Sequence, residues 1–592
     1  MTIRLPLHVF LFLATLVVGA PSAARVAHAA PVLIEATSLT LRDDVAAPVD
    51  ARKRKLVFRS STSRAAAASR IVPPSPGAAD DPTLAGATLY VANAAGSGEI
   101  ARIALPSSGW TAQGTASRPR GYRFTDRSPG AVVPSLTIAP DRISLRASGE
   151  SFVYTLDEPQ QGRIALRLDL GGASWCTEAP ARATGNPPST ASNDAPGRFT
   201  AQAKSSPPAL CTLNRLTVGN GYGSGTYPAG STVHVFAAVQ PQSQLVTGWT
   251  GDTSLLAEPD EWHTTLVMPA ADASVAATIA SRPTTLAVTT FTGSTTRAKT
   301  VRAKVPPGAR GLVLLLHGTN GGDGFILQDE TFAVALRLLE AGYGVLGTEA
   351  EESVAGDLNG DGKKRWDAGL TTANVDFANL DALIAALRAA GTIGPTTPLF
   401  VLGMSNGGST SLSLGAVAAS PVAASFPNLR FAAVISFCAD GRATAAAITT
   451  TPTAWLMCGN DDNPEVDNAA AAVNSAGLAA RGIPTAFALH PAAPLYDERF
   501  ARVAGVSAAT SRAIAAELRA AGFLAADGFF TLSTDDLVAA VTATPSLLPT
   551  LVALSGAQKS DVIDQVRAAQ AEHQMYSDWA ARAVAFFDAH GS

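Results

Sequence analysis

The chain has 592 residues and a formal net charge of -4, and 47% of its residues are hydrophobic against 16% charged. This length predicts about three or four domains, and this composition excludes a disordered polyelectrolyte and a coiled coil. The charge balance argues against nucleic acid as a partner, since the one basic run, residues 52–55, is interpreted as a solvated strand edge or linker.

Residues 1–29 have the pattern of a secretory signal peptide. Arg4 precedes an apolar run over 9–18, and Ala27 and Ala29 form an A-x-A cleavage site. We therefore expect cleavage after Ala29 and a secreted protein, in the extracellular space, the periplasm or at the cell surface. An uncleaved anchor is the alternative. No later apolar run reaches the roughly 18 residues of a membrane span, so no span is expected.

Residues 30–211 are rich in Pro, Gly, Ser and Thr and contain short alternating runs, such as 88–92 and 163–170. This pattern predicts an all-β domain. Cys176 and Cys211 bracket a Pro/Ser-rich stretch at its end. In an oxidising compartment we expect a disulfide between them, with two buried thiols as the alternative.

Residues 212–282 have a different pattern. Alternate glycines over 219–225 precede Tyr227, and W-T-G-D at 249–252 and an M-P pair at 268–269 follow. The segment resembles the InlB-type bacterial B-repeat, a small β-grasp-like module of exported proteins. The glycines are interpreted as turn formers and the Trp as core. The resemblance implies a spacing or attachment role, so a cell surface or a polymer is a possible partner of the β modules.

Residues 283–592 alternate between strands and helices. The continuous apolar run GLVLLL at 311–316 predicts a buried strand, and the apolar spacing over 332–341 and 376–390 predicts amphipathic helices. Such alternation predicts a doubly wound, mostly parallel sheet with the active site at the carboxyl ends of its strands.

Ser405 is the candidate nucleophile. The strand predicted at 399–402 leads directly into G-M-S-N-G at 403–407, and a helix is predicted over 409–419. This order is that of a nucleophile elbow, where a sharp turn strains the serine and the flanking small residues let strand and helix approach each other.

A glycine-rich loop, H-G-T-N-G-G at 317–322, ends the strand predicted upstream. A tetrahedral intermediate needs two N–H donors, and we expect the backbone amides of Thr319 and Asn406 to supply them as an oxyanion hole. His317 is interpreted as a structural residue that hydrogen-bonds within this loop.

The catalytic acid should follow a later strand, and the strand predicted at 452–458 is followed by two candidates, Asp461 and Asp462. The sequence context favours Asp461, and Asp462 stays as the alternative. The other of the two is interpreted as a turn-forming residue.

Three histidines follow these aspartates. His573 precedes the last predicted helix, at 578–589, and is the expected base. His490 ends a predicted strand and His590 lies at the chain end, so both are less suitable. The order Ser405, acid, His573 is the order of the α/β-hydrolases.

The segments H-G-T-N-G-G, G-M-S-N-G-G and E-H-Q-M-Y-S-D together resemble exported α/β-hydrolase esterases of the polyhydroxybutyrate-depolymerase and feruloyl-esterase type. The resemblance covers about 310 residues and implies cofactor-free acyl transfer on a small-molecule or polymeric ester, which could be a polyester or a plant- or lipid-type ester. Two alternatives remain: a serine peptidase of the prolyl-oligopeptidase type, and a surface-binding protein without activity. No repeat of 40 to 50 residues is found for the propeller that such a peptidase carries.

Residues 357–367 resemble the start of a calcium loop, with oxygen-bearing side chains at positions 1, 3 and 5. Position 12 is Ala368, which has no carboxylate, so no metal site is assigned and a polar loop is the alternative. Cys438 and Cys458 each end a predicted strand, and we expect a disulfide that holds the acid loop.

Residues 491–570 are an insert between the last core strand and His573. Helices are predicted over 511–524 and 534–544. We expect a lid that lines an acyl pocket with Phe523, Phe529 and Phe530, and a helical subdomain that only thickens the fold is the alternative.

Overall fold

The computed structural model describes residues 31–591 apart from 35, 45–49, 66, 94–99, 116–117, 129, 150, 153, 157–160, 162–163, 171, 179–192, 202–212 and 525–527. The expected signal peptide, with its cleavage site at Ala29, lies outside the described residues. Cys211 lies outside them too, and with it the expected bridge to Cys176. Among the helices described, none has the length and apolar character needed to cross a membrane.

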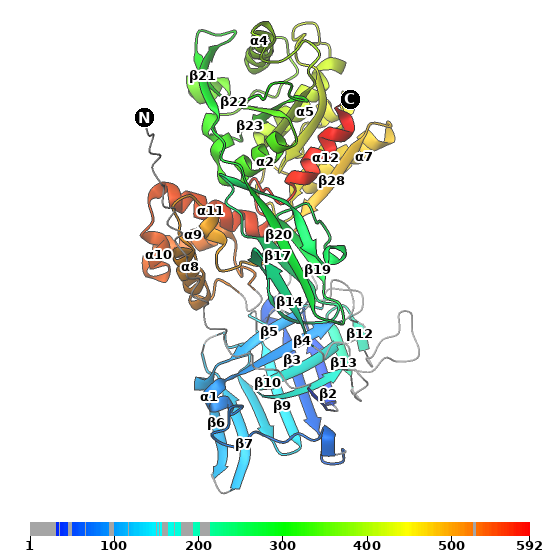
Figure 1. Ribbon diagram of the computed structural model, residues 1–592, viewed down its shortest axis with the longest axis vertical. Helices are drawn as coiled ribbons and strands as arrows, with labels where there is room; N and C mark the ends of the chain where they lie inside the picture. Colours follow the sequence, from blue (N-terminus) through cyan, green and yellow to red (C-terminus); the bar gives the residue numbers. More distant parts are fainter. Residues whose placement is uncertain are drawn as a thin grey trace, which may run out of the picture.

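Two sheets, antiparallel except for one parallel pair of strands at the edge of the first, form the N-terminal part (Figure 1). Alternate side chains of the third strand, such as Leu56 and Phe58, are buried in the apolar core that the two sheets enclose. The expected β domain is present, and its described residues also include one short helix, α1 (Pro82–Ala85), and the 3-10 turns η1 (Ala51–Lys53), η2 (Ala67–Ser69) and η3 (Ser107–Gly109). The first sheet has the order β1 (Val32–Leu33), β11 (Ala173–Glu178), β10 (Ile164–Leu170), β4 (Ala87–Asn93), β5 (Ile100–Leu105), and the second has the order β12 (Asn193–Ala195), β13 (Arg198–Ala201), β2 (Ala36–Arg42), β3 (Lys55–Ser61), β9 (Arg142–Ser148), β8 (Ser135–Ala139), β7 (Arg118–Thr125), β6 (Trp110–Thr115).

Two smaller sheets follow and lie between the N-terminal sheets and the C-terminal part (Figure 1). Trp249 is buried in their shared core, as expected. Residues 213–282 contain no α-helix, only the 3-10 turn η5 (Thr253–Leu255), so this module lacks the helix that covers the sheet in a β-grasp. The sheets have the orders β16 (Gly225–Pro228), β14 (Leu213–Gly219), β20 (Ala273–Ser281), β18 (Gln244–Gly251) and β15 (Gly221–Tyr222), β17 (Thr232–Ala237), β19 (His263–Val267).

An eight-stranded sheet forms the centre of the C-terminal part. Its first two strands run antiparallel to their neighbours and the other six are parallel. All five residues of β23 are buried, which explains its unbroken apolar run. The strand order is β21 (Ala287–Thr292), β22 (Ala298–Lys304), β24 (Gly344–Gly347), β23 (Leu312–Leu316), β25 (Leu399–Met404), β26 (Phe431–Phe437), β27 (Thr453–Cys458), β28 (Thr485–His490).

Helices cover both faces of this sheet. One core packs α2 (Asp329–Glu340) and α12 (Ala580–His590) on one face, and a second packs α4 (Val375–Ala389) on the other. The expected doubly wound arrangement is present. The remaining helical elements are η6 (Asp323–Leu327), α3 (Glu351–Ala355), α5 (Asn406–Ala416), η7 (Val417–Ala419), α6 (Ala443–Ile448) and α7 (Asn468–Ala480).

The insert is a helical unit with its own apolar core. Helix α11 begins at a capping box, in which Ser555 and Gln558 satisfy each other's backbone N–H groups, and ends at Ala571 in the left-handed conformation. The insert lies beside the two small sheets (Figure 1). Its elements are η8 (Arg499–Arg502), α8 (Ala508–Ala520), α9 (Thr534–Ala543), η9 (Pro545–Leu547), α10 (Pro549–Val552) and α11 (Gly556–Gln570).

Candidate active site

Ser405 lies in the sharp turn between β25 and α5, with φ 58° and ψ -125°. This is a strained backbone conformation for a residue with a side chain. The flanking glycines make the turn possible. A Cβ on Gly403 would lie 2.2 Å from the carbonyl oxygen of Gly407, and a Cβ on Gly407 would lie 2.3 Å from that of Leu316. The G-x-S-x-G spacing therefore reflects close backbone approach at this turn.

Ser405, His573 and Asp461 lie in hydrogen-bonding reach of one another. The Ser405 Oγ is 2.9 Å from His573 Nε2, and His573 Nδ1 is 2.9 and 3.1 Å from the two Asp461 carboxylate oxygens. The Asp461 side chain is 1% exposed and that of His573 is 18% exposed. A carboxylate placed in this way fixes the imidazole tautomer that leaves Nε2 free to accept the serine proton.

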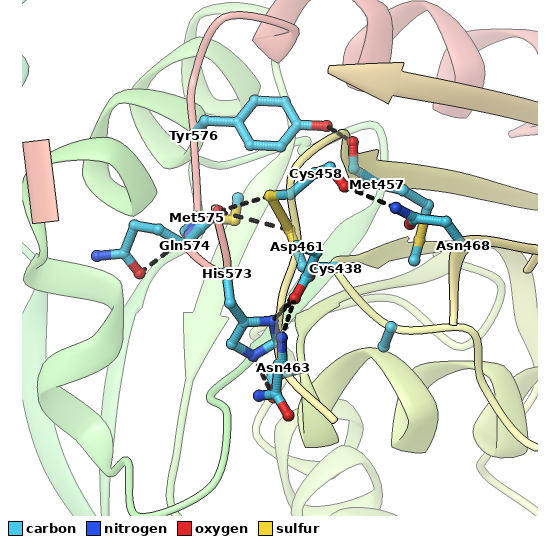
Figure 2. Close-up of a disulfide and its surroundings, with 12 residues drawn as sticks. Cys438, Met457, Cys458, Asp461, Asn463, Asn468, His573, Gln574, Met575 and Tyr576 are labelled. Atoms are coloured by element: carbon cyan, nitrogen blue, oxygen red, sulfur yellow. Dashed lines mark hydrogen bonds and ion pairs between the residues drawn. A yellow bond between two sulfur atoms is a disulfide. The ribbon is translucent and has the colours of Figure 1, made fainter. Parts of the chain in front are cut away.

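The two neighbouring aspartates face different surroundings. Asp461 faces His573, as Figure 2 shows, and its Oδ1 also accepts a hydrogen bond of 3.1 Å from the backbone N–H of Asn463. Asp462 lines the cleft in front of Ser405. Only Asp461 is in a position to orient the imidazole.

His573 lies in a loop between α11 and α12 that is fixed by buried contacts. Ala571 precedes it in the left-handed conformation, and the Glu572 carboxylate accepts a hydrogen bond of 3.0 Å from the backbone N–H of Thr534 in the insert. Sequence reasoning did not identify Glu572. Its only signal is its place next to His573, since the contact joins positions 38 residues apart.

Cys438 and Cys458 form a disulfide between the ends of β26 and β27, with their Cα atoms 5.6 Å apart, as the sequence predicts. The bridge lies beside Asp461 (Figure 2). The carbonyl oxygen of Gln574, the residue after His573, is 3.5 Å from Cys438 Sγ and 3.4 Å from Cys458 Sγ. The bridge therefore contacts the loop of the imidazole as well as bracing that of the carboxylate.

The glycine-rich loop after β23 passes directly beside Ser405. A Cβ on Gly318 would lie 3.1 Å from the Ser405 Cβ, and Thr319 lines the cleft. Asn406 is the first residue of α5, and its side-chain oxygen accepts a hydrogen bond of 2.8 Å from the backbone N–H of Trp366. Asn406 thus directly follows the nucleophile and Thr319 lines the same cleft, and Trp366, which sequence reasoning missed, braces the elbow.

His317 has a structural setting, as expected. Its Nδ1–H donates to the carbonyl oxygen of Gly318 at 2.7 Å, and its Nε2 accepts from the backbone N–H of Ala350 at 3.1 Å. Burial lowers the pKa of His317 to about 4, so the ring is neutral at physiological pH. His490 is hydrogen-bonded to Asp578, and His590 packs against Phe586 at the end of α12.

A cleft of about 890 Å³ opens in front of Ser405. The side chains of the insert that reach it are Asp535 and Arg567, and Glu572 adds a further carboxylate. The expected acyl pocket of phenylalanines is wrong. Phe523 and Phe530 pack on the insert's own core, and Phe529 packs edge-on against His234 of the small sheets. The lining consists of His317, Gly318, Thr319, Gly321, Gly322, Gly324, Phe325, Gln328, Lys363, Met404, Ser405, Asp462, Asn463, Pro464, Glu465, Asp535, Arg567, Glu572, His573 and Gln574.

Two groups of described residues bring three potential metal ligands together, and neither has the geometry of an open metal site. In Cys438, Cys458 and Asp461 the sulfurs form the disulfide. In His263, His490 and Asp578 both imidazoles hydrogen-bond to one carboxylate oxygen, at 2.6 and 2.9 Å. Two ligands of a tetrahedral zinc ion are about 3.3 Å apart, so these contacts fit hydrogen bonds better than metal coordination.

The calcium-like loop satisfies its own carboxylates. Asp357 accepts hydrogen bonds of 2.8 Å from the backbone N–H of Gly360 and 2.7 Å from that of Gly362, and Asp361 pairs with Arg365 at 2.9 Å.

Comparisons with known proteins add the following. Similar folded structures include a serine hydrolase from Xanthomonas campestris described as lacking a lid (19% identity, 36% of this chain and 86% of that one, TM-score 0.25) and a dienelactone hydrolase from Anabaena variabilis (21% identity, 35% and 86%, TM-score 0.26). A third is esterase 2 of Thermogutta terrifontis phosphorylated by paraoxon (12% identity, 35% and 82%, TM-score 0.26). No curated protein matches the chain. A model of the divergent InlB B-repeat domain matches residues 211–282, so this segment is similar to that domain.

Proposed function

We propose that the chain is an exported serine hydrolase of the α/β type that cleaves carboxylic esters through an acyl-enzyme. The observation that carries the proposal is the 2.9 Å contact between Ser405 Oγ and His573 Nε2 on a strained elbow, with Asp461 behind the imidazole. A nucleophile, a base and an orienting carboxylate in this geometry are the parts that acyl transfer requires.

In the proposed reaction, Ser405 Oγ attacks the ester carbonyl carbon while its proton passes to His573 Nε2. The backbone N–H groups of Thr319 and Asn406 stabilise the resulting oxyanion. The intermediate then expels the alcohol, which takes the proton from His573. A water molecule attacks the acyl-enzyme, His573 removes its proton, and the acid leaves as Ser405 recovers its hydrogen. Asp461 stabilises the imidazolium at both stages.

The architecture of the C-terminal sheet supports the α/β-hydrolase assignment. The fourth strand along the chain, β24, lies between the second and the third, and the nucleophile follows the fifth, β25. In that family the nucleophile turn sits at the carboxyl edge of such a sheet, with the oxyanion loop after the third strand. The N-terminal sheets form a sandwich-like pair, which does not favour the peptidase alternative with its propeller.

The chemistry of the cleft favours polar esters. Two ion pairs line it, one between Lys363 and Glu465 and one between Arg567 and Asp535, whose nearest nitrogen and oxygen are 2.9 Å apart. A long aliphatic acyl chain would remove water from these charged groups and offer them no hydrogen bond in return. We therefore propose an ester whose acyl or alcohol part carries hydroxyl or charged groups, as a small molecule or as part of a polymer.

Export is part of the proposal. The expected signal peptide, the disulfide between Cys438 and Cys458 and the B-repeat match at 211–282 support it, since disulfides persist in oxidising compartments. The N-terminal sheets are proposed to attach the enzyme to a polymer or a cell surface.

Turnover of a substrate panel tests the proposal. The panel contains short and long nitrophenyl esters, acylated sugars, a polyester film and peptides, and Ser405→Ala is the blank. Ser409→Ala, one turn further along α5, is the matched control. We expect ester turnover by the unmodified protein and by Ser409→Ala, and none by Ser405→Ala. Turnover of peptides alone, or ester turnover that survives in Ser405→Ala, would contradict it.

A further inference from the structure

The loop that carries His573 is also anchored from the B-repeat-like module. Asp578 lies five residues after His573 and is 3% exposed. Its Oδ2 accepts two hydrogen bonds, one of 2.9 Å from His490 Nε2 at the end of β28 and one of 2.6 Å from His263 Nδ1 at the start of β19. A buried carboxylate needs such donors, so the loop is held between the parallel sheet and the module.

Two neighbours of His263 also contact the C-terminal part, Glu261 at helix α12 and Trp262 at η8 of the insert. The Glu261 carboxylate accepts hydrogen bonds of 3.1 and 3.0 Å from the backbone N–H groups of Ala581 and Arg582, in the first turn of α12. Carboxylates are favourable there because the first N–H groups of a helix have no partner within the helix. Trp262 is 6% exposed and packs under the guanidinium of Arg502, 3.7 Å from its ring centre.

The module and the C-terminal part share an apolar core. Tyr496, in the insert, stacks on Tyr222 of β15 and packs on Phe236 of β17, each with ring centres 4.6 Å apart. Ala493 belongs to the same core. A spacer would present a polar surface to its neighbour. This contact is instead aromatic and buried, so it favours a fixed orientation of the module.

We infer that the B-repeat-like module is part of the catalytic unit, in which His263 and Glu261 act as positioning residues for the loop that carries His573. The inference rests on the proposed function. The loop is held on its upstream side by Glu572 through Thr534 and on its downstream side by Asp578. Loss of His263 removes one of the two hydrogen bonds that hold Asp578 and leaves the one from His490. A shift of about 1 Å in a catalytic group is enough to reduce the rate about 100-fold.

The test compares His263→Ala with His263→Asn in the full chain. The Asn side-chain N–H branches from Cγ as Nδ1 does, and so reaches Asp578. We expect His263→Ala to lower kcat for a short nitrophenyl ester about 10- to 100-fold with KM unchanged, and His263→Asn to recover most of that loss. Backbone amides over 571–579 should exchange hydrogen faster in His263→Ala only.

The matched control is Val275→Ala, which opens a cavity at a residue that is 1% exposed and pairs with Val218 and Gly251 inside the module. It should lower the melting temperature and leave kcat unchanged. If His263→Ala does not fold, His263→Gln replaces it, because its longer side chain displaces the N–H group from Asp578.

Unchanged kcat and unchanged exchange in the folded His263 variant would overturn the inference, and so would an equal loss of kcat in Val275→Ala. The exchange measurement needs no substrate. If Ser405 of the unmodified protein does not react with an organophosphonate, the proposed function fails, while exchange over 571–579 still decides whether the module anchors the loop.

Discussion

Replacing Asp461 by Asn should abolish most of the activity through the imidazole tautomer. Asp461 Oδ1 already accepts a hydrogen bond from the backbone N–H of Asn463, while Oδ2 lies 2.9 Å from His573 Nδ1. In Asp461→Asn the amide oxygen keeps the Asn463 contact, so the NH2 group faces Nδ1. The imidazole then carries its proton on Nε2 and cannot accept the one from Ser405.

The size of this effect follows from the loss of the base. In serine proteases the same change lowers kcat about 10⁴-fold, which corresponds to about 5.4 kcal/mol of transition-state stabilisation. We expect a similar loss here, because the Asp461 side chain is 1% exposed and shielded from solvent. The assay is the kcat for a short nitrophenyl ester at constant pH, with the melting temperature as a folding check.

Asp462→Asn is the matched control, since it removes the same charge one residue further on. It should change KM more than kcat, because Asp462 lines the cleft. Equal losses of kcat in the two variants, or a larger loss in Asp462→Asn, would refute the assignment of Asp461.

Three further predictions concern the frame of the site. Gly407→Ala should lower the melting temperature sharply, because its Cβ would lie 2.3 Å from the Leu316 carbonyl oxygen. The control Gly477→Ala in α7, with open space around the new Cβ, should leave the free energy of unfolding unchanged or raise it by about 0.5–1 kcal/mol. A Gly407→Ala variant with an unchanged melting temperature would contradict the elbow geometry. Removing the disulfide in the double variant Cys438→Ser and Cys458→Ser should lower the free energy of unfolding by about 3 kcal/mol, given the sequence separation of 20 residues. Mass mapping of the unreduced protein should find Cys438 and Cys458 joined, and free thiols at these positions would contradict the prediction. Burial lowers the pKa of His317 to about 4, so the unfolded chain binds a proton at this ring more readily than the folded chain does. The stability that His317 contributes to the folded state is therefore fully present above about pH 6.5. As pH falls towards 4, this contribution to the free energy of unfolding decreases by on the order of 3 kcal/mol. Denaturant unfolding from pH 7 to 4 should show a shallower loss in His317→Gln, and an identical pH dependence in both proteins would show that the ring is not buried neutral.

The elements that the sequence predicted best are those with a local cause. The apolar run of β23 and the G-x-S-x-G elbow depend on burial and on backbone contacts within a short stretch, so pattern alone located them. The helix after Ser405 begins at Asn406, three residues earlier than predicted. Its start is set by the turn itself, which places the Ser405 carbonyl oxygen against the Ser409 N–H.

The contacts that the sequence could not predict join distant positions. Asp461 and Asp462 are adjacent, and only the turn to Asn463 decides which carboxylate faces His573. The contact between His263 and Asp578 spans 315 residues, and no periodicity encodes it. The phenylalanines of the insert failed as an acyl pocket for a related reason. Their apolar character predicted burial, but the partner that buries them is the insert's own core or the neighbouring module.

The most direct test of the proposed chemistry is covalent labelling of the full chain by an organophosphonate, followed by peptide mapping. The account predicts a single adduct on Ser405, formed far more slowly in His573→Ala and absent in Ser405→Ala. An adduct on another residue, or no adduct on the folded protein, would contradict the assignment of Ser405 as an activated nucleophile.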